Sequence, residues 1–95
     1  MGYVQPNERL SIPALILANG PQGWGPWTGE KGNSTCWPSG LTVAATWDAE
    51  LAERWGVAMG TEFFEKGTNV QLGPGLCLAR VPRNGRNFEY LSGVS

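Results

Sequence analysis

The sequence predicts an α/β fold, and three segments carry this prediction. Residues 14–18 form a short unbroken apolar run, which is typical of a strand buried on both faces. Residues 48–66 carry apolar side chains at three- and four-residue spacing, which indicates an amphipathic helix. Residues 69–72 follow at once as a second short strand. Strand, helix and strand in this order predict a right-handed βαβ unit with two parallel strands.

A long loop is expected between the first strand and the helix. The strand is closed by Asn19, Gly20 and Pro21, a sequence that favours a sharp turn. Residues 20–40 then hold six glycines, three prolines and three tryptophans without a helical or alternating period. Loops of this length are usually functional or disordered, and the tryptophans argue against disorder.

The predicted helix begins and ends at residues that suit those positions. Asp48 is the expected N-cap, and Gly67 supplies the C-terminal stop. One face of the helix carries the apolar side chains of Leu51, Trp55, Ala58, Met59 and Phe63. The opposite face is charged and holds two i, i+4 pairs in the favourable order, Glu50 with Arg54 and Glu62 with Lys66. This pattern indicates a surface helix lying on a sheet.

The second strand is closed in the same way as the first, by Gly73, Pro74 and Gly75. In a parallel sheet both Gly-Pro turns lie at the carboxyl end, where α/β sheets and barrels carry their ligand sites. Beyond the second turn come three arginines interspersed with proline and glycine, and then a short amphipathic tail. One βαβ unit with exposed edges does not make a stable parallel sheet. Residues 1–95 are therefore predicted to be a single partial domain.

Length, charge and composition exclude several classes of function. Ninety-five residues make one domain at most, with a marginal core. Seven Lys and Arg against eight Asp and Glu give a net charge of −1, so neither nucleic acid nor an anionic membrane is expected as a partner. The absence of histidine excludes Cys/His metal sites and Ser-His or Cys-His catalysis. The glycine-rich stretches fit neither a dinucleotide fingerprint nor a P-loop, so no cofactor and no metal are expected.

Targeting and compartment are less constrained by the sequence. The longest apolar runs, residues 13–18 and 41–45, are far shorter than the roughly 20 residues that cross a bilayer, and no basic-then-apolar leader precedes them. We therefore expect no membrane span and no signal peptide. Cys36 and Cys77 could form one disulfide, remain two reduced thiols, or act as a redox pair, which only their number supports. Asn33 begins an Asn-Ser-Thr sequon and is a candidate glycosylation site if the protein is secreted.

Aromatic and cationic residues near the two turns have two interpretations each. Trp24, Trp27 and Trp37 could stack on sugar rings or close a hydrophobic cluster. We favour the cluster for Trp37 and leave both alternatives open for the other two. Arg86 offers a planar fork of donors that can span two sugar hydroxyls, or it could simply tie its loop. Glu89 is close enough in sequence to pair with a nearby arginine.

Five segments, taken in order, resemble a known family. They are Arg-Leu-Ser-Ile-Pro-Ala-Leu at residues 9–15, Asn-Gly-Pro-Gln-Gly at 19–23, Trp-Pro-Ser-Gly-Leu-Thr-Val-Ala-Ala-Thr-Trp-Asp at 37–48, Ala-Met-Gly-Thr-Glu-Phe at 58–63, and residues 72–93, which include Gly-Arg-Asn-Phe-Glu. Together they resemble the N-terminal domain of glycoside hydrolase family 3, in particular its β-glucosidases. Because the resemblance spans nearly the whole chain, it is more specific than any single motif.

The resemblance implies a fold and a mechanism. It implies part of a (β/α)8 TIM-type barrel, made of the first βα units with long loops on the carboxyl-end face. It also implies retaining hydrolysis through a covalent glycosyl-enzyme, with an aspartate nucleophile from late in the barrel and a glutamate acid/base commonly from a second domain. That mechanism needs two carboxyl groups about 5 to 5.5 Å apart. Neither motif occurs in this sequence, so we expect no catalytic residue here and no activity from this chain alone.

The resemblance also implies candidate sugar ligands. Asn19 occupies the position of a family aspartate that accepts hydrogen bonds from sugar hydroxyls, and Gly25 replaces a commonly found arginine. Arg86 retains the arginine of the family's Gly-Arg-Asn-Phe/Trp-Glu motif, which is another hydroxyl ligand. The predicted substrate-binding residues are therefore Arg86 and Asn19. After Gly93 the family typically continues Glu-Asp-Pro, which this sequence lacks, so a fragment is expected.

Two hypotheses of function follow from the sequence. The first is a fragment of a retaining β-glucosidase, which hydrolyses terminal β-D-glucosyl residues, contributing part of the glucose subsite without the nucleophile or the acid/base. Its parent would bind a β-glucoside or oligosaccharide, and the resemblance implies that this parent is secreted. The alternative is a small non-catalytic carbohydrate-binding or interaction protein derived from such an enzyme.

Overall fold

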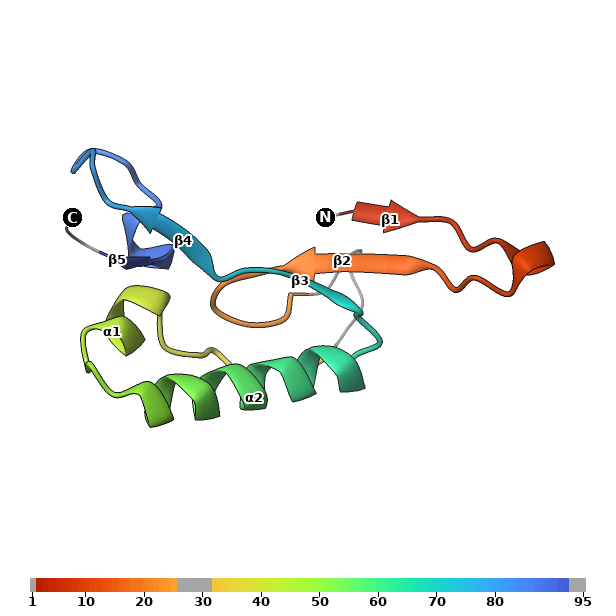
Figure 1. Cartoon of the computed structure of the whole chain (residues 1–95), viewed down its shortest axis with the longest axis horizontal. Helices are drawn as coiled ribbons and strands as arrows, with labels where there is room; N and C mark the ends of the chain where they lie inside the picture. The colour runs from red at the N-terminus through yellow and green to blue at the C-terminus, as the bar shows by residue number, and fades with distance from the viewer. Residues whose placement is uncertain (1, 26–31, 93–95) are drawn as a thin grey trace.

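The computed structural model describes residues 2–25 and 32–92, which form two small sheets, two α-helices and two 3-10 turns (Figure 1). In chain order the elements are β1 (Gly2–Val4), η1 (Glu8–Leu10), β2 (Leu15–Asn19), α1 (Gly40–Ala44), α2 (Ala49–Glu65), β3 (Val70–Leu72), β4 (Gly75–Leu78), η2 (Asn87–Glu89) and β5 (Tyr90–Ser92). No helix among the described residues is long and apolar enough to span a membrane.

The predicted βαβ unit is present as β2, α2 and β3. Strands β2 and β3 pair in parallel, with Leu17 opposite Val70 and Asn19 opposite Leu72. The first strand begins and ends one residue later than predicted. Strand β1, which the sequence did not predict, pairs antiparallel with β2 and completes the order β1-β2-β3. A three-residue strand carries no periodicity, and only its pairing with β2 reveals it.

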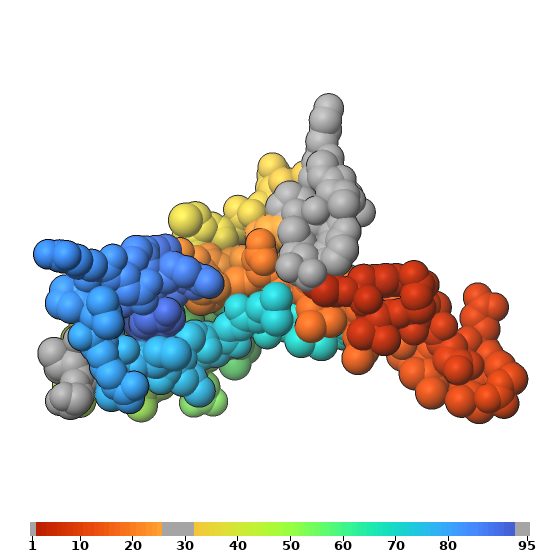
Figure 2. Space-filling model, turned by 90° about the horizontal axis from the view of Figure 1, so that it is seen from above, coloured from red at the N-terminus to blue at the C-terminus, as the bar shows by residue number. Residues whose placement is uncertain are grey.

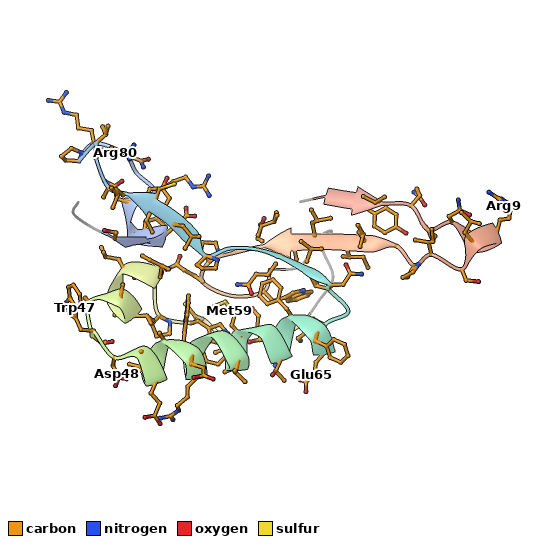
Figure 3. The ribbon with its side chains drawn as sticks, viewed as in Figure 1. Arg9, Trp47, Asp48, Met59, Glu65 and Arg80 are labelled. Carbon is orange, nitrogen blue, oxygen red and sulfur yellow. The ribbon has the colours of Figure 1, made fainter. Side chains whose placement is uncertain are left out.

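Helix α2 confirms the prediction for residues 48–66 within one residue at each end. The Asp48 carboxylate accepts a hydrogen bond from the Leu51 N–H at 3.0 Å, as an N-cap does. Met59 lies on the face of α2 that is directed at the strands (Figure 3) and is buried. Leu51, at the first turn, is instead exposed. The apolar face is thus used for packing from its middle to its C-terminal end.

The hydrophobic core lies between α2 and the first sheet. It consists of the buried side chains of Ala18, Trp24, Met59 and Phe63, with Trp37 and Trp55 packed against it. Trp37 therefore belongs to a hydrophobic cluster, which confirms the interpretation favoured for it. Trp24 is only 9% exposed and its indole N–H donates to the Thr68 hydroxyl at 3.1 Å, so it is part of the core. Trp27 lies outside the described residues.

The two i, i+4 ion pairs predicted on α2 are not formed. Within the described ranges, no charged groups of α2 approach each other within 4.0 Å, and Glu62 instead accepts from the Thr35 N–H at 2.8 Å and the Trp37 indole N–H at 2.9 Å. The Lys66 ammonium donates to the Asn33 carbonyl oxygen at 2.7 Å. Exposed i, i+4 pairs contribute little, so the unpaired N–H and C=O groups of the loop are better partners. These contacts tie the long loop to α2.

Three elements, α1, β4 and β5, were not predicted from the sequence. The predicted loop ends at residue 40, where the Ser39 hydroxyl caps α1 by accepting from the Thr42 N–H at 3.3 Å. Strands β4 and β5 pair in parallel as a second sheet, and α1 packs against β5. A Cβ on Gly40 would lie 3.0 Å from the Glu89 carbonyl oxygen, so α1 approaches the segment before β5 closely at this glycine. Strands of three or four residues exist here only because they pair with each other.

The two Gly-Pro turns lie side by side at the carboxyl end of β2 and β3, as predicted. Gly20 adopts a positive φ of 113°, and the Gly73–Pro74 peptide bond is cis. A Cβ on Gly73 would lie 2.9 Å from the Pro21 Cα, so the turns approach each other backbone to backbone. Glycine at this position is therefore a packing requirement.

The molecule is elongated. Figure 2 shows β1 and η1 at one end and the β4–β5 sheet at the other. The radius of gyration of the Cα atoms is 15.3 Å, against about 12 Å for a compact chain of this length. Large apolar side chains are exposed along it, among them Val4, Ile12, Phe64, Leu76 and Val81. The fold therefore has the open edges expected of a partial barrel.

We predict that Glu62→Gln loosens the long loop. Its amide keeps one acceptor oxygen and loses the other, so one of the two bonds to Thr35 and Trp37 is lost. We expect the free energy of unfolding to fall by about 1 kcal/mol, measured by urea titration, and the Trp37 indole proton to exchange faster with solvent. Glu53→Gln on the exposed face of α2 is the matched control, and an equal effect in both variants would contradict the assignment.

The same carboxylate predicts a pH dependence. The hydrogen bonds from Thr35, and then that from Trp37, hold the pKa of Glu62 below its ordinary value of 4.5, against the opposing effect of burial. Because the folded-state pKa is lowered, this stabilisation is present above pH 4.5 and is lost as the pH falls through the folded pKa. Glu62→Gln should reduce the stability difference between neutral and acidic pH, whereas Glu53→Gln should leave it unchanged.

We also predict that Gly73→Ala separates the two Gly-Pro turns. The added Cβ would meet Pro21 backbone atoms at 2.9 and 3.1 Å, and backbone moves less readily than the end of a side chain. We expect a loss of about 1 to 3 kcal/mol in the free energy of unfolding, measured by thermal denaturation. Gly85→Ala is the control, because its Cβ would meet no atom within 4 Å. Unchanged stability in Gly73→Ala would show that the turns are not in close contact.

Candidate functional site

A hollow of about 410 Å³ lies at the carboxyl ends of β2 and β3. Its lining comes from the end of β2 and its turn, from the end of β3, and from the segment before β5: Asn19, Gly20, Gln22, Leu72, Arg86 and Glu89. Both residues predicted from the sequence as ligands, Asn19 and Arg86, therefore line one hollow. This is the edge at which open parallel sheets bind ligands.

Arg86 forms a bidentate ion pair with Glu89. The Nε atom donates to Oε1 at 2.6 Å and the Nη2 atom donates to Oε2 at 2.9 Å. This confirms the expectation that Glu89 pairs with a nearby arginine. The hydrogen bonds from Arg86 hold the pKa of Glu89 below its ordinary value, and those to Glu89 raise the pKa of Arg86. A guanidinium has five N–H donors, so three remain for a ligand.

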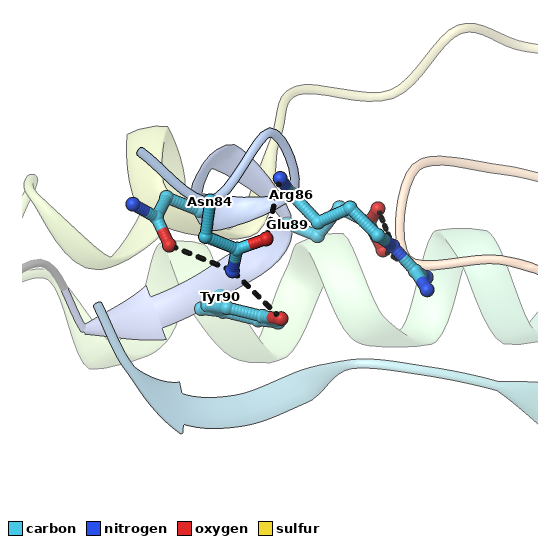
Figure 4. Close-up of polar contacts among 5 residues, drawn as sticks. Asn84, Arg86, Glu89 and Tyr90 are labelled. Atoms are coloured by element: carbon cyan, nitrogen blue, oxygen red, sulfur yellow. Dashed lines mark hydrogen bonds and ion pairs between the residues drawn. The ribbon is translucent and has the colours of Figure 1, made fainter. Parts of the chain in front are cut away.

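Asn84 holds the segment that carries Arg86 (Figure 4). Its Oδ1 accepts from the Arg86 backbone N–H at 3.2 Å, and its Nδ2 donates to the Asn87 Oδ1 at 3.0 Å and the Tyr90 hydroxyl at 3.3 Å. Asn87 in turn donates to the Val81 carbonyl oxygen at 2.9 Å. The backbone that presents the Arg86 side chain is therefore fixed by side-chain amides. One feature of the sequence indicates this arrangement, namely the two asparagines, Asn84 and Asn87, on either side of Gly85-Arg86.

Gln71 of β3 contacts the turn that follows Asn19. Its amide donates to the Gly20 carbonyl oxygen at 3.2 Å and contacts the Met59 sulfur at 2.8 Å. Among the described residues, the Asn19 side chain makes no hydrogen bond, so its amide is free to donate to and accept from a ligand. Sequence reasoning missed Gln71 and Gln22. The position of Gln71 in the strand alternation, on the helix side of β3, is the signal that could have found it.

A larger hollow of about 500 Å³ lies between β2 and the C-terminal end of α2, and the core residues Ala18 and Trp24 are part of its lining. It is lined mainly by apolar groups, together with Lys66, Thr68 and Gly25. Lys66 already donates to the Asn33 carbonyl oxygen, and the Thr68 hydroxyl already accepts from Trp24. Because the smaller hollow contains both predicted sugar ligands and lies at the carboxyl ends of the parallel strands, we assign the candidate site to it. Gly25 lines only the larger one.

The remaining sequence candidates lie outside the hollow. Cys36 and Cys77 are both exposed and are free thiols, so no disulfide joins them. Asn33 is exposed, as a glycosylation acceptor must be, and its use stays a prediction. Within residues 2–25 and 32–92, no cluster of three or more His, Cys, Asp and Glu side chains could hold a metal ion.

The chain is similar to proteins of one family throughout its described length. Residues 2–92 match the model described as "Glycosyl hydrolase family 3 N terminal domain". The chain is 40% identical over 98 residues to thermostable beta-glucosidase B of Acetivibrio thermocellus, covering 95% of this chain and 13% of that protein. It is 44% identical over 85 residues to beta-glucosidase A of Aspergillus kawachii, covering 88% and 9%. The chain thus spans about a tenth of the length of these relatives.

Solved structures agree with the sequence matches. Beta-glucosidase 3B from Thermotoga neapolitana, in complex with glucose, superposes with a TM-score of 0.81 at 40% identity, covering 94% of this chain and 13% of that one. DesR, a beta-glucosidase from Streptomyces venezuelae in complex with D-glucose, superposes with a TM-score of 0.82 at 35% identity, covering 94% and 11%. The chain therefore belongs to glycosyl hydrolase family 3, and its α/β elements are part of that family's N-terminal TIM-type barrel.

Proposed function

We propose that this chain forms part of the glucose subsite of a retaining β-glucosidase, which hydrolyses terminal β-D-glucosyl residues, with Arg86 and Asn19 as sugar ligands. The observation that carries the proposal is the convergence of these two side chains on one hollow at the carboxyl ends of β2 and β3. The names of the two solved relatives, both complexes with glucose, support the choice of sugar.

The free polar groups of the hollow suit a sugar. Three guanidinium N–H groups of Arg86 remain after pairing with Glu89 and can donate to adjacent hydroxyl oxygens. The Asn19 amide can accept from one hydroxyl and donate to another. Asn84 and Gln71 fix the backbone beneath these ligands, so less conformational entropy is lost on binding. Protein side chains that are held in place in this way can recognise one sugar unit.

The described residues that line the hollow supply binding groups but no carboxylate available for bond cleavage. Glu89 is the only carboxylate among the described residues that line it, and both of its oxygens accept from Arg86. Retaining hydrolysis needs two carboxyl groups on opposite sides of the scissile bond. We therefore propose that the described residues bind the sugar and do not cleave it. The same observation favours the alternative function, a non-catalytic carbohydrate-binding protein.

We predict that the purified 95-residue chain hydrolyses an aryl β-glucoside no faster than buffer. The physical reason is that the described residues around the hollow offer no pair of carboxylates free of an ion pair. Release of the aryl group is followed by absorbance, with a full-length family 3 β-glucosidase as the positive control. Hydrolysis above background with retention of the anomeric configuration would contradict the proposal.

We predict that Arg86→Ala weakens glucose binding about ten-fold, because it removes charge-assisted donors to sugar hydroxyls. Binding is measured by titrating the ¹⁵N-labelled chain with glucose and following backbone amide shifts around the hollow. Arg83→Ala is the matched control, since Arg83 is exposed on the same segment and does not line the hollow. Glucose binding by Arg86→Ala that is as tight as in the wild-type chain would exclude Arg86 as a sugar ligand. Loss of binding in both would point to the segment as a whole.

A further inference from the structure

We propose that Glu89 makes the hollow selective for neutral sugars over sugars that carry a carboxylate or phosphate. This inference rests on the proposed function, because it takes the hollow to be a sugar site, and it assigns the class of sugar. Glu89 would act through Arg86, so it is a specificity-determining residue and not a direct ligand.

The hollow contains few charged groups. Among the described residues that line it, Arg86 and Glu89 are the only charged ones. Asn19 and Gln22 are polar and uncharged, and the remaining lining is apolar or backbone. The net charge at the hollow is therefore set by one ion pair. An isolated guanidinium in the same place would attract a carboxylate or phosphate, which match its fork of donors.

The ion pair occupies one edge of the Arg86 guanidinium. Glu89 takes the Nε and Nη2 donors on one edge of the guanidinium, at 2.6 and 2.9 Å. That edge cannot also bind a ligand carboxylate in the bidentate manner. The donors left over can still bond to hydroxyl oxygens, which need no compensating positive charge. Pairing thus removes much of the attraction for an anion while it keeps the donors that a neutral sugar uses.

The ion pair is formed without a ligand, and two features hold it in place. The Glu89 side chain is 13% exposed, whereas that of Arg86 is 72% exposed, so the carboxylate is the fixed partner. The Glu89 backbone N–H donates to the Arg86 carbonyl oxygen at 3.1 Å, which holds the two residues at one turn of η2. The lowered pKa of Glu89 and the raised pKa of Arg86 agree with both groups being charged at neutral pH. The hollow therefore has this charge state before a ligand arrives.

The test compares glucose with glucuronate, which differ at C6 by a carboxylate. The 95-residue chain, Glu89→Gln and the control Glu65→Gln are titrated with each sugar, and amide shifts around the hollow give the affinities. Glu65 lies at the C-terminal end of α2 and does not line the hollow, so its replacement makes the same charge change elsewhere.

We expect the wild-type chain to bind glucuronate no more tightly than glucose. In Glu89→Gln the ratio of glucuronate to glucose affinity should rise up to about five-fold, the upper range for a solvent-accessible ion pair. The rise should shrink at high salt, because screening weakens exposed charges. Glu65→Gln should keep the wild-type ratio.

Two results would overturn the inference. One is a wild-type chain that prefers glucuronate, and this result stands even if Glu89→Gln fails to fold, as judged by the Trp24 and Trp37 indole signals. The other is a folded Glu89→Gln with an unchanged ratio. Failure of the proposed function has a different signature. In that case neither sugar binds at the hollow, or glucose binding does not depend on Arg86.

Discussion

The parallel pairing of β2 with β3 is the contact on which the candidate site depends. It sets Asn19 opposite Leu72, so the Gly-Pro turns that follow both strands meet at one edge of the sheet. Helix α2 maintains the pairing by burying Met59 and Phe63 against Ala18 of β2. Each large side chain buried in this way contributes roughly 1.5 to 3 kcal/mol, which in a chain with a marginal core is a large share of the stability.

The polar side of α2 serves the tertiary structure as much as its apolar side. Glu62 binds two N–H groups of the long loop, one of them the Trp37 indole, and the Trp37 backbone N–H donates to the Gln22 carbonyl oxygen at 3.0 Å. Because Gln22 lines the hollow, helix α2 and the site are connected through this loop.

The site is built from two kinds of support with different physical roles. Side-chain amides, from Asn84 on one side and Gln71 on the other, fix the backbone that presents the ligands. The carboxylate of Glu89 fixes the guanidinium of Arg86 and cancels its charge. Under the proposed function the first kind would limit the entropy that binding costs, and the second is proposed to set which ligands the guanidinium attracts. Neither kind requires the site to carry a reactive carboxylate.

The sequence by itself determined the βαβ unit, the ends of α2 and the place of the candidate site, because these follow from local patterns: a buried apolar run, helical spacing, an aspartate N-cap and two Gly-Pro turns. The resemblance to a family added Asn19 and Arg86 as candidate sugar ligands.

Only the tertiary structure decided the rest. Strands β1, β4 and β5 are too short to carry a period, and they exist because they find a partner. Trp24 could face a ligand or the core until packing placed it in the core. Glu62 does not pair with Lys66 because its carboxylate accepts from the Thr35 backbone N–H and the Trp37 indole N–H, which are distant in sequence and are better donors to it than an exposed lysine.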